Sequence, residues 1–171
     1  MQTYENCEGK YGKYIMQQLI LPAVHATPEA VADYTALGRK RIHWVDGNNM
    51  PGAFQLNTSW YLAPNREMQL DPNAKTNTYT KWQPHVHDVD EMLCFYGSNP
   101  DDPYNLNGEI EIILGDESHI LTKSSLIFVP AGLSHTPPLV NRVDRPIFHF
   151  SMVLNSEYNF ATDSGETFQA K

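Results

Sequence analysis

The stretch His85-Val86-His87-Asp88-Val89-Asp90-Glu91 decides how this sequence of 171 residues is interpreted. Side chains alternate between faces in an extended chain, so positions 85, 87 and 91 share one parity and can point the same way. Two imidazoles and a carboxylate that converge from one stretch offer three ligands to a metal ion. The spacing therefore predicts the larger part of a metal site, with one further ligand from elsewhere in the chain.

His135 is the candidate for that further ligand, because it follows Val129-Pro130-Ala131-Gly132, where a predicted strand ends in a tight turn. An H-x-H pair alone is common and often structural, but Glu91 and a downstream P-x-G-x-x-H element make coincidence a poor explanation. Three imidazoles and one carboxylate leave two open positions on a six-coordinate ion. They suit divalent iron, manganese, nickel, cobalt or zinc, and the lack of thiolate ligands argues against a closed structural zinc site.

These residues resemble the two motifs of the cupin superfamily. The first motif, G-x5-H-x-H-x3,4-E-x6-G, is matched by residues 85–91, and the second, G-x5-P-x-G-x2-H-x3-N, by residues 130–135. The resemblance covers about residues 53–154. It implies an all-β fold, the cupin double-stranded β-helix or jelly-roll barrel. It also implies one divalent transition metal held by four residues: His85, His87, Glu91 and His135.

Four framework positions depart from these motifs. Tyr79 and Ser124 stand where the leading glycines are expected, Gly97 arrives one residue early, and Leu139 takes the place of the closing asparagine. These positions shape strand ends and turns and are not ligands, so the departures affect the expected turns and not the metal site.

Short strands with regular turn signals surround the motifs. Alternation over residues 54–60 predicts a half-buried strand, and further β-rich runs follow at 78–83, 92–96, 109–114, 119–122, 126–129 and 147–154. Residues 97–108 hold two prolines and many turn formers, which predicts a loop. We expect the barrel over residues 51–155, an N-terminal extension over 1–50 that serves as an arm or lid, and a C-terminal tail over 156–171.

The N-terminal extension is expected to carry a short helix. Thr27-Pro28-Glu29 is typical of a helix start, since it combines a capping hydroxyl, a proline at the first helical position and an acid near the positive end of the dipole. Gly38 suits the left-handed end of such a helix. The basic triplet Arg39-Lys40-Arg41 could bind an anion, although a solvated helix end is the favoured interpretation.

Further residues are expected around the metal. His149 shares parity with Ile147 and Ser151, and if that face is the barrel interior it would be a catalytic base or a substrate contact. A partly buried structural histidine is the competing interpretation. Phe95 shares parity with Glu91 and is expected to line a substrate pocket, together with three residues before the first ligand: Tyr79, Lys81 and Gln83. Cys94 has the opposite parity and is expected to pack, and His25, His43 and His119 are expected to be ordinary residues.

Charge and cysteine content restrict the partners and the compartment. Twenty acidic and twelve basic residues give a formal charge of −8, which makes nucleic acid and anionic membranes poor partners. Two cysteines are too few for a disulfide framework and favour a cytosolic protein with reduced thiols. Residues 1–13 lack the pattern of a signal peptide, and the apolar run at 15–24 is too short to span a membrane. We therefore expect a cytoplasmic protein.

The resemblance leaves the activity open, because cupins include dioxygenases, decarboxylases, isomerases, lyases, sugar-binding regulators and storage proteins. The leading hypothesis is a metal-dependent enzyme, of dioxygenase or of lyase or decarboxylase type, acting on a small oxygen-bearing molecule that chelates the metal. Glu91 or His149 would then move a proton. The alternative is a non-catalytic barrel that binds or senses a small molecule. Family analogy and the need to cover sheet edges further predict a homodimer.

Overall fold

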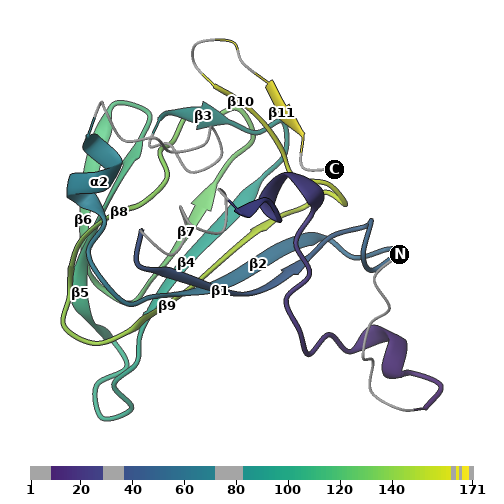
Figure 1. Ribbon diagram of the computed structural model, residues 1–171. Helices are drawn as coiled ribbons and strands as arrows, with labels where there is room; N and C mark the ends of the chain where they lie inside the picture. Colours follow the sequence, from purple (N-terminus) through teal and green to yellow (C-terminus); the bar gives the residue numbers. More distant parts are fainter. Residues whose placement is uncertain (1–8, 29–36, 72–82, 163–164, 166, 170–171) are drawn as a thin grey trace.

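The structure, a computed structural model, describes residues 9–28, 37–71, 83–162, 165 and 167–169 (Figure 1). In this part of the chain the helical elements are the short 3-10 helices η1 (Gly12–Tyr14) and η2 (Ala23–His25) and the helix α2 (Arg66–Leu70). The strands are β1 (Arg39–Val45), β2 (Gln55–Tyr61), β3 (His85–Val86), β4 (Glu91–Gly97), β5 (Asn105–Leu114), β6 (Glu117–Lys123), β7 (Ser125–Val129), β8 (Leu139–Val143), β9 (Ile147–Val153), β10 (Asn159–Thr162) and β11 (Thr167–Gln169). No helix in these ranges is long and apolar enough to cross a membrane.

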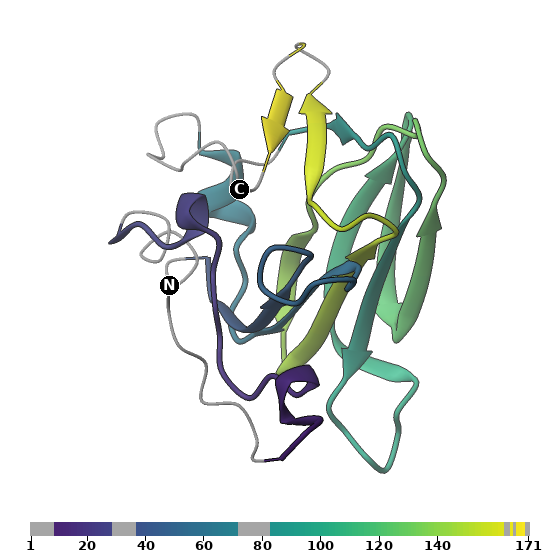
Figure 2. The same ribbon diagram turned by 90° about the vertical axis from the view of Figure 1, so that its right-hand side faces the viewer.

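The strands form three antiparallel sheets. Their orders are β1-β2-β9-β4-β7, β6-β5-β8 and β11-β10-β3. Figures 1 and 2 show the five-stranded sheet and the sheet β6-β5-β8 facing each other; these are the two larger sheets. Strands β3, β10 and β11 lie at the upper end, and the N-terminal segment that carries η1 lies outside the two larger sheets. Apolar side chains of both larger sheets meet in the core between them, which consists of Tyr61, Leu93, Phe95, Leu106, Ile110, Ile112, Val129, Val140 and Ile147.

Strands β2 and β9 of the five-stranded sheet turn polar side chains toward the barrel interior. In β2 the buried residues are Gln55, Asn57, Ser59 and Tyr61, whereas the apolar residues of the same alternation lie on the outer face. The polar positions continue onto β9, because Asn57 pairs with Ser151 and Ser59 with the buried His149. Buried polar groups are retained where they have partners or bind a ligand. The interior of the barrel therefore holds an apolar core and, beside it, a polar compartment.

The outer face of the same sheet is apolar. A row across four strands follows from the register, which pairs Leu56 with Met152, Met152 with Met92, and Met92 with Phe128. Phe128 is 54% exposed. Further along the same face Trp60 pairs with Phe148, and the centroids of their rings lie 5.2 Å apart. At β2 the polarity is thus the reverse of the usual arrangement with an apolar inner face, whereas β4 contributes Leu93 and Phe95 to the apolar core.

The predicted strands at 92–96, 109–114, 119–122, 126–129 and 147–154 are confirmed as β4, β5, β6, β7 and β9. The prediction that all of residues 97–108 form a loop is wrong at both ends, because β4 includes Gly97 and β5 begins at Asn105. Two local features allow the strand there. Asn107 takes a positive φ of 51°, and a Cβ on Gly108 would lie 2.6 Å from the Arg142 carbonyl oxygen, so only glycine lets β8 come this close.

The pairing of the outermost strands departs from the expected bounds of the barrel at 51–155. Strand β1 lies within the expected N-terminal extension and pairs with β2, and β10 lies within the expected tail and pairs with β3. Each covers a strand edge that would otherwise expose unpaired backbone groups. The predicted helix falls mainly on residues 29–36, and the strand predicted at 78–83 falls, except for Gln83, on residues 72–82; both segments lie outside the described residues.

Candidate metal centre

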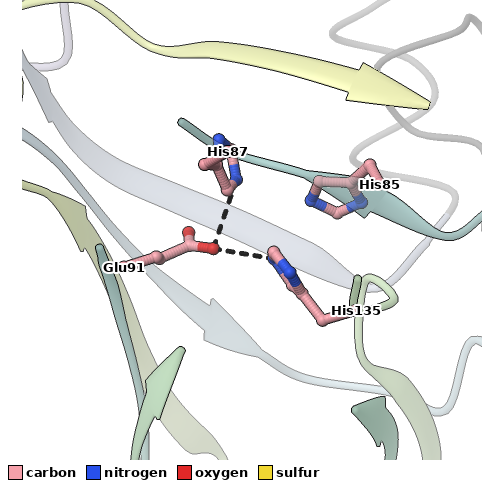
Figure 3. A group of neighbouring side chains, drawn as sticks. All are labelled: His85, His87, Glu91 and His135. Atoms are coloured by element: carbon pink, nitrogen blue, oxygen red, sulfur yellow. Dashed lines mark hydrogen bonds and ion pairs between the residues drawn. The ribbon is translucent and has the colours of Figure 1, made fainter. Parts of the chain in front are cut away.

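Four side chains converge where β3, of the sheet β11-β10-β3, lies close to the start of β4 (Figure 3). His85 lies on β3, His87 directly follows that strand, Glu91 begins β4, and His135 precedes β8. Their ligand atoms all lie within 4.8 Å of one another, and each residue is at most 7% exposed. The structure thus brings together the four residues that the sequence selects as metal ligands.

Backbone hydrogen bonds hold the two ligand segments side by side. The His85 N–H donates to the His135 carbonyl at 2.9 Å, and the His135 N–H donates to the His85 carbonyl at 3.0 Å. The Gly132 N–H donates to the His87 carbonyl at 2.8 Å. Gly132 has a φ of 80°, which glycine adopts without strain, so the P-x-G turn sets the position of His135 relative to the first motif.

Each ligand histidine has its Nδ1 against a backbone carbonyl. The distances are 3.3 Å from His85 to Gln83, 2.6 Å from His87 to Asn159 and 3.1 Å from His135 to Leu133. A carbonyl oxygen only accepts hydrogen bonds, so Nδ1 carries the proton in each ring. In the neutral rings Nε2 is then a bare lone pair, which is the arrangement found in metal-binding histidines.

The contacts of Glu91 test whether these residues fit a metal ion. Its Oε2 lies 2.9 Å from His135 Nε2 and 3.3 Å from His87 Nε2 (Figure 3). A carboxylate oxygen and a bare lone pair repel each other at such distances unless a proton or a cation lies between them. Three imidazole nitrogens and one carboxylate are also a preferred ligand set for divalent transition metals. The group therefore fits a metal ion.

The members of the metal-free cluster differ in the direction of their pKa shifts. Burial, followed by His135 and His87, lowers the pKa of His85 to about 3, so its imidazole is neutral near pH 7. Burial alone would raise the pKa of the Glu91 carboxyl, but hydrogen bonds with His135 and His87 outweigh it and hold the pKa below its usual range. Burial opposes protonation of His87, but the hydrogen bond and the charge of Glu91 prevail and raise its pKa.

A cavity of about 90 Å³ adjoins the cluster. His149 and Gln83, both expected near the site, line it. Phe95 does not. It is fully buried in the apolar core, and its ring stacks on His149 with centroids 4.7 Å apart. Its parity with Glu91 places Phe95 inside the barrel. Because β4 runs from the cavity into the core, Phe95 lies in the core and contacts the cavity residue His149. Tyr79 and Lys81 lie outside the described residues.

His149 presents one defined nitrogen to the cavity side. Its Nδ1 donates to the Cys94 carbonyl at 3.0 Å. Burial, followed by the charge of Arg39, lowers the pKa of His149 to about 3, so the ring is neutral and Nε2 is an acceptor. Cys94 itself is buried, and burial raises its thiol pKa to about 11, in keeping with a packing role.

Three further residues line the cavity that the sequence does not predict there: His25, Arg39 and Arg41. Arg39 and Arg41, for which a solvated helix end is the favoured interpretation from the sequence, lie on β1 and line the cavity. His25, expected to be an ordinary residue, is 2% exposed, lines the same cavity and has its ring 4.9 Å from that of Trp44. The two-residue spacing of the arginines is compatible with one face of a strand, but the predicted helix start at Thr27-Pro28-Glu29 favoured a solvated helix end.

The buried histidines predict acid sensitivity. Burial, with smaller effects of nearby arginines, lowers the pKa values of His25 and His149 from 6.5 to about 3. Between these values the unfolded chain binds more protons, so the free energy of unfolding decreases as pH falls below 6.5. From pH 7 to pH 5 we expect each histidine to contribute a loss of about 2 kcal/mol. Urea denaturation in the presence of a chelator measures it. His149→Gln, which cannot titrate, should reduce the pH dependence; an unchanged dependence would contradict the assignment.

Comparison with known proteins adds only distant structural likenesses. No protein-family model and no curated protein matches the sequence. Oxalate oxidase in complex with glycolate is similar at 13% identity and a TM-score of 0.47, over 88% of this chain and 63% of that chain. An RmlC-like cupin from Shewanella frigidimarina is similar at 12% identity and a TM-score of 0.37, over 67% and 73%. The DMSP lyase DddQ from Ruegeria pomeroyi is similar at 13% identity and a TM-score of 0.43, over 91% and 64%.

This chain thus spans less than two thirds of the oxalate oxidase and the lyase structures. The assignment of the fold rests on the chain itself. Antiparallel sheets face each other around one interior, and the two motif segments pair so that four ligand residues meet at the inner wall. The chain therefore has the all-β fold of antiparallel sheets that the resemblance to cupins implies.

Proposed function

We propose that this chain is a metal-dependent enzyme that acts on a small oxygen-bearing organic molecule. The observation that carries the proposal is a buried group of three imidazoles and one carboxylate at the wall of a cavity. A buried carboxylate needs a proton donor or a cation beside it, and a metal ion that binds the three imidazoles would be such a cation. A cavity beside it gives a substrate access to the same atoms.

The ligands would be His85, His87, Glu91 and His135, with a metal that supplies Lewis acidity to an oxygen atom of the substrate. Around them, His149 offers Nε2 as an acceptor for a substrate proton, held in orientation by its bond to the Cys94 carbonyl and by the Phe95 ring. Leu93, Pro137 and Pro138 give the cavity an apolar side that limits water. Dioxygenase chemistry and lyase or decarboxylase chemistry are both compatible with these groups, and the metal identity determines which is assayed first.

Elemental analysis of protein purified without affinity nickel tests the proposal. We expect about one transition metal ion per chain, as four protein ligands hold one ion. The double variant His85→Ala, His87→Ala should lose it. The matched control His43→Ala, His119→Ala removes two histidines outside the cavity and should retain it.

Each outcome directs the next assay. Iron leads to oxygen-uptake assays, and nickel, zinc or manganese leads to lyase and decarboxylase substrates. No metal after reconstitution would refute the proposal. Tight binding of a small molecule without chemical change would favour the alternative of a sensor. The homodimer and the cytoplasmic location stay predictions.

A further inference from the structure

We propose that Gln83, His149 and Ser151 form a neutral polar subsite, and that the molecule bound in the cavity carries a hydroxyl group next to a carbonyl or carboxylate oxygen. This inference rests on the proposed function, since it names the substrate class for the same cavity. It requires that the three side chains line the cavity, that the hydrogen-bonding atom each one offers is defined, and that one small ligand satisfies them together.

His149 and Ser151 are neighbours on the inner face of β9. They are two residues apart and only 3% and 5% exposed, whereas Phe150 between them belongs to the outer face. Both line the cavity that also touches three residues of the metal cluster. Residues two apart on a strand lie about 7 Å from each other, so one small group in the cavity can contact both side chains.

A series of hydrogen bonds defines the direction of the Ser151 hydroxyl. Arg39 Nη2 donates to Asn57 Oδ1 at 2.8 Å, and Asn57 Nδ2 in turn donates to Ser151 Oγ at 2.5 Å. Because Oγ accepts this bond, the hydroxyl proton of Ser151 points away from Asn57. The proton has no acceptor within the described part of the chain. Ser151 therefore offers a hydrogen-bond donor at the cavity wall.

His149 offers the complementary acceptor. Its Nδ1 donates to the Cys94 carbonyl at 3.0 Å, which leaves Nε2 of the neutral ring with a lone pair. A hydroxyl group accepts from Ser151 and donates to His149 at the same time. A methyl or methylene group in its place would leave two buried polar groups without partners, which is unfavourable. The two residues of β9 therefore select a ligand with a hydroxyl group.

Gln83 offers a second donor beside the metal cluster. It lies two residues before His85, and its backbone carbonyl is 3.3 Å from His85 Nδ1. Its side chain lines the cavity, and its Nε2 is buried without a hydrogen-bond partner among the residues that the structure describes. A buried N–H group that lacks an acceptor is unfavourable. A carbonyl or carboxylate oxygen of the ligand would accept from it.

The size of the cavity limits the ligand. A volume of about 90 Å³ leaves room for a short carbon skeleton, so the hydroxyl and the second oxygen must lie close together in the molecule. Leu93, Pro137 and Pro138 provide apolar contacts for that skeleton. A small hydroxy acid and its neutral amide share this chemistry, and the experiment separates them.

Isothermal titration calorimetry with two matched pairs of probes tests the inference. Lactate is compared with propionate, and lactamide with propionamide; each pair differs only in the hydroxyl group, and the two pairs differ in charge. Both enantiomers of lactate and lactamide are titrated into the full chain, whose metal content is measured beforehand. In at least one pair we expect the hydroxylated member to bind about ten-fold more tightly or better, because the other member leaves Ser151 and His149 unpaired. The tighter pair shows whether the ligand is an acid or a neutral molecule.

Variants assign this selectivity to individual residues. Ser151→Ala should reduce the ratio of the two affinities to about three-fold or less, because the donor to the hydroxyl is lost. Ser151→Cys keeps the volume of the side chain but is a weak donor, and it should give an intermediate ratio. Gln83→Leu should weaken both members of the pair by about ten-fold and leave their ratio unchanged, since both carry the oxygen that Gln83 contacts. Ser118→Ala, on the exposed part of β6, is the matched control and should change neither quantity. Thermal unfolding verifies that each variant is folded.

Equal binding within both pairs would overturn the inference, since water and not the ligand would then occupy the position between Ser151 and His149. A ratio that is unchanged in Ser151→Ala, or no binding of any probe, would overturn it as well. Failure of the proposed function is distinguishable. Selectivity for the hydroxyl group in a chain that takes up no metal would support the subsite and refute the metal enzyme, and metal uptake with equal binding within both pairs would do the reverse.

Discussion

Replacing Glu91 by glutamine is expected to lower the metal affinity of the chain by about 100-fold or more. Loss of a group that merely orients a ligand already weakens metal binding by about 10–100-fold, and Glu91 is the carboxylate of the cluster, which would bind the ion directly. Glutamine keeps the shape of the side chain but removes the negative charge that lies 2.9 Å from His135 Nε2 and 3.3 Å from His87 Nε2.

Competition with a chelator of known affinity measures the change. A second readout is the rise in melting temperature on metal addition: an ion at about 100 times its dissociation constant stabilises a folded chain by about 2.7 kcal/mol. This rise should disappear in Glu91→Gln. Glu117→Gln, which removes an exposed carboxylate of β6, is the matched control. Wild-type affinity in Glu91→Gln would exclude Glu91 as a ligand.

Replacing Phe95 by alanine is expected to destabilise the fold by about 3–5 kcal/mol, the range for removal of a fully buried aromatic ring. Phe95 has no exposed surface, belongs to the core and stacks on His149 with an angle of 18° between the rings. The variant would leave a void directly under His149, because two strands hold the backbone at both residues in register.

Urea denaturation of the metal-free chain gives the free energies of unfolding. Phe128→Ala is the matched control, because it removes the same side chain from the outer face of the sheet, where the ring is 54% exposed. Its effect should be within about 1 kcal/mol of zero. An equally small effect in Phe95→Ala would show that the core does not depend on this ring.

The metal cluster was predictable because most of its geometry is local. His85 and His87 are two residues apart at β3, a short bend brings Glu91 at the start of β4 back to them, and the turn before His135 returns the chain to the same place. The barrel followed from the same motifs and from turn signals between short strands. Both features depend on neighbours in sequence, which a pattern of residues records directly.

The cavity wall was not predictable in the same way. In β2 the polar residues point inward and the apolar ones outward, and alternation alone does not reveal which set faces the interior. The arginines of β1 become cavity residues only through pairing with β2, where Arg39 meets Tyr61 in register. Phe95 and Glu91 lie on the same face of β4, but Phe95 is four residues further along the strand, in the apolar core. Where the cavity ends and the core begins depends on how the two sheets pack, which the sequence pattern does not record.

Strand β10 completes the site, although it follows all four residues of the cluster in the sequence. All four ligand residues have been synthesised once His135 is added, but the carbonyl that holds the His87 ring belongs to Asn159, and the strand pair that supports β3 needs Thr162 and Ala161. During translation the imidazole of His87 therefore leaves the ribosome before the group that fixes its rotation. A truncated chain that ends before β10 would contain all four residues but lack the Asn159 carbonyl and the pairing of β3, so we expect it to bind metal more weakly than the full chain.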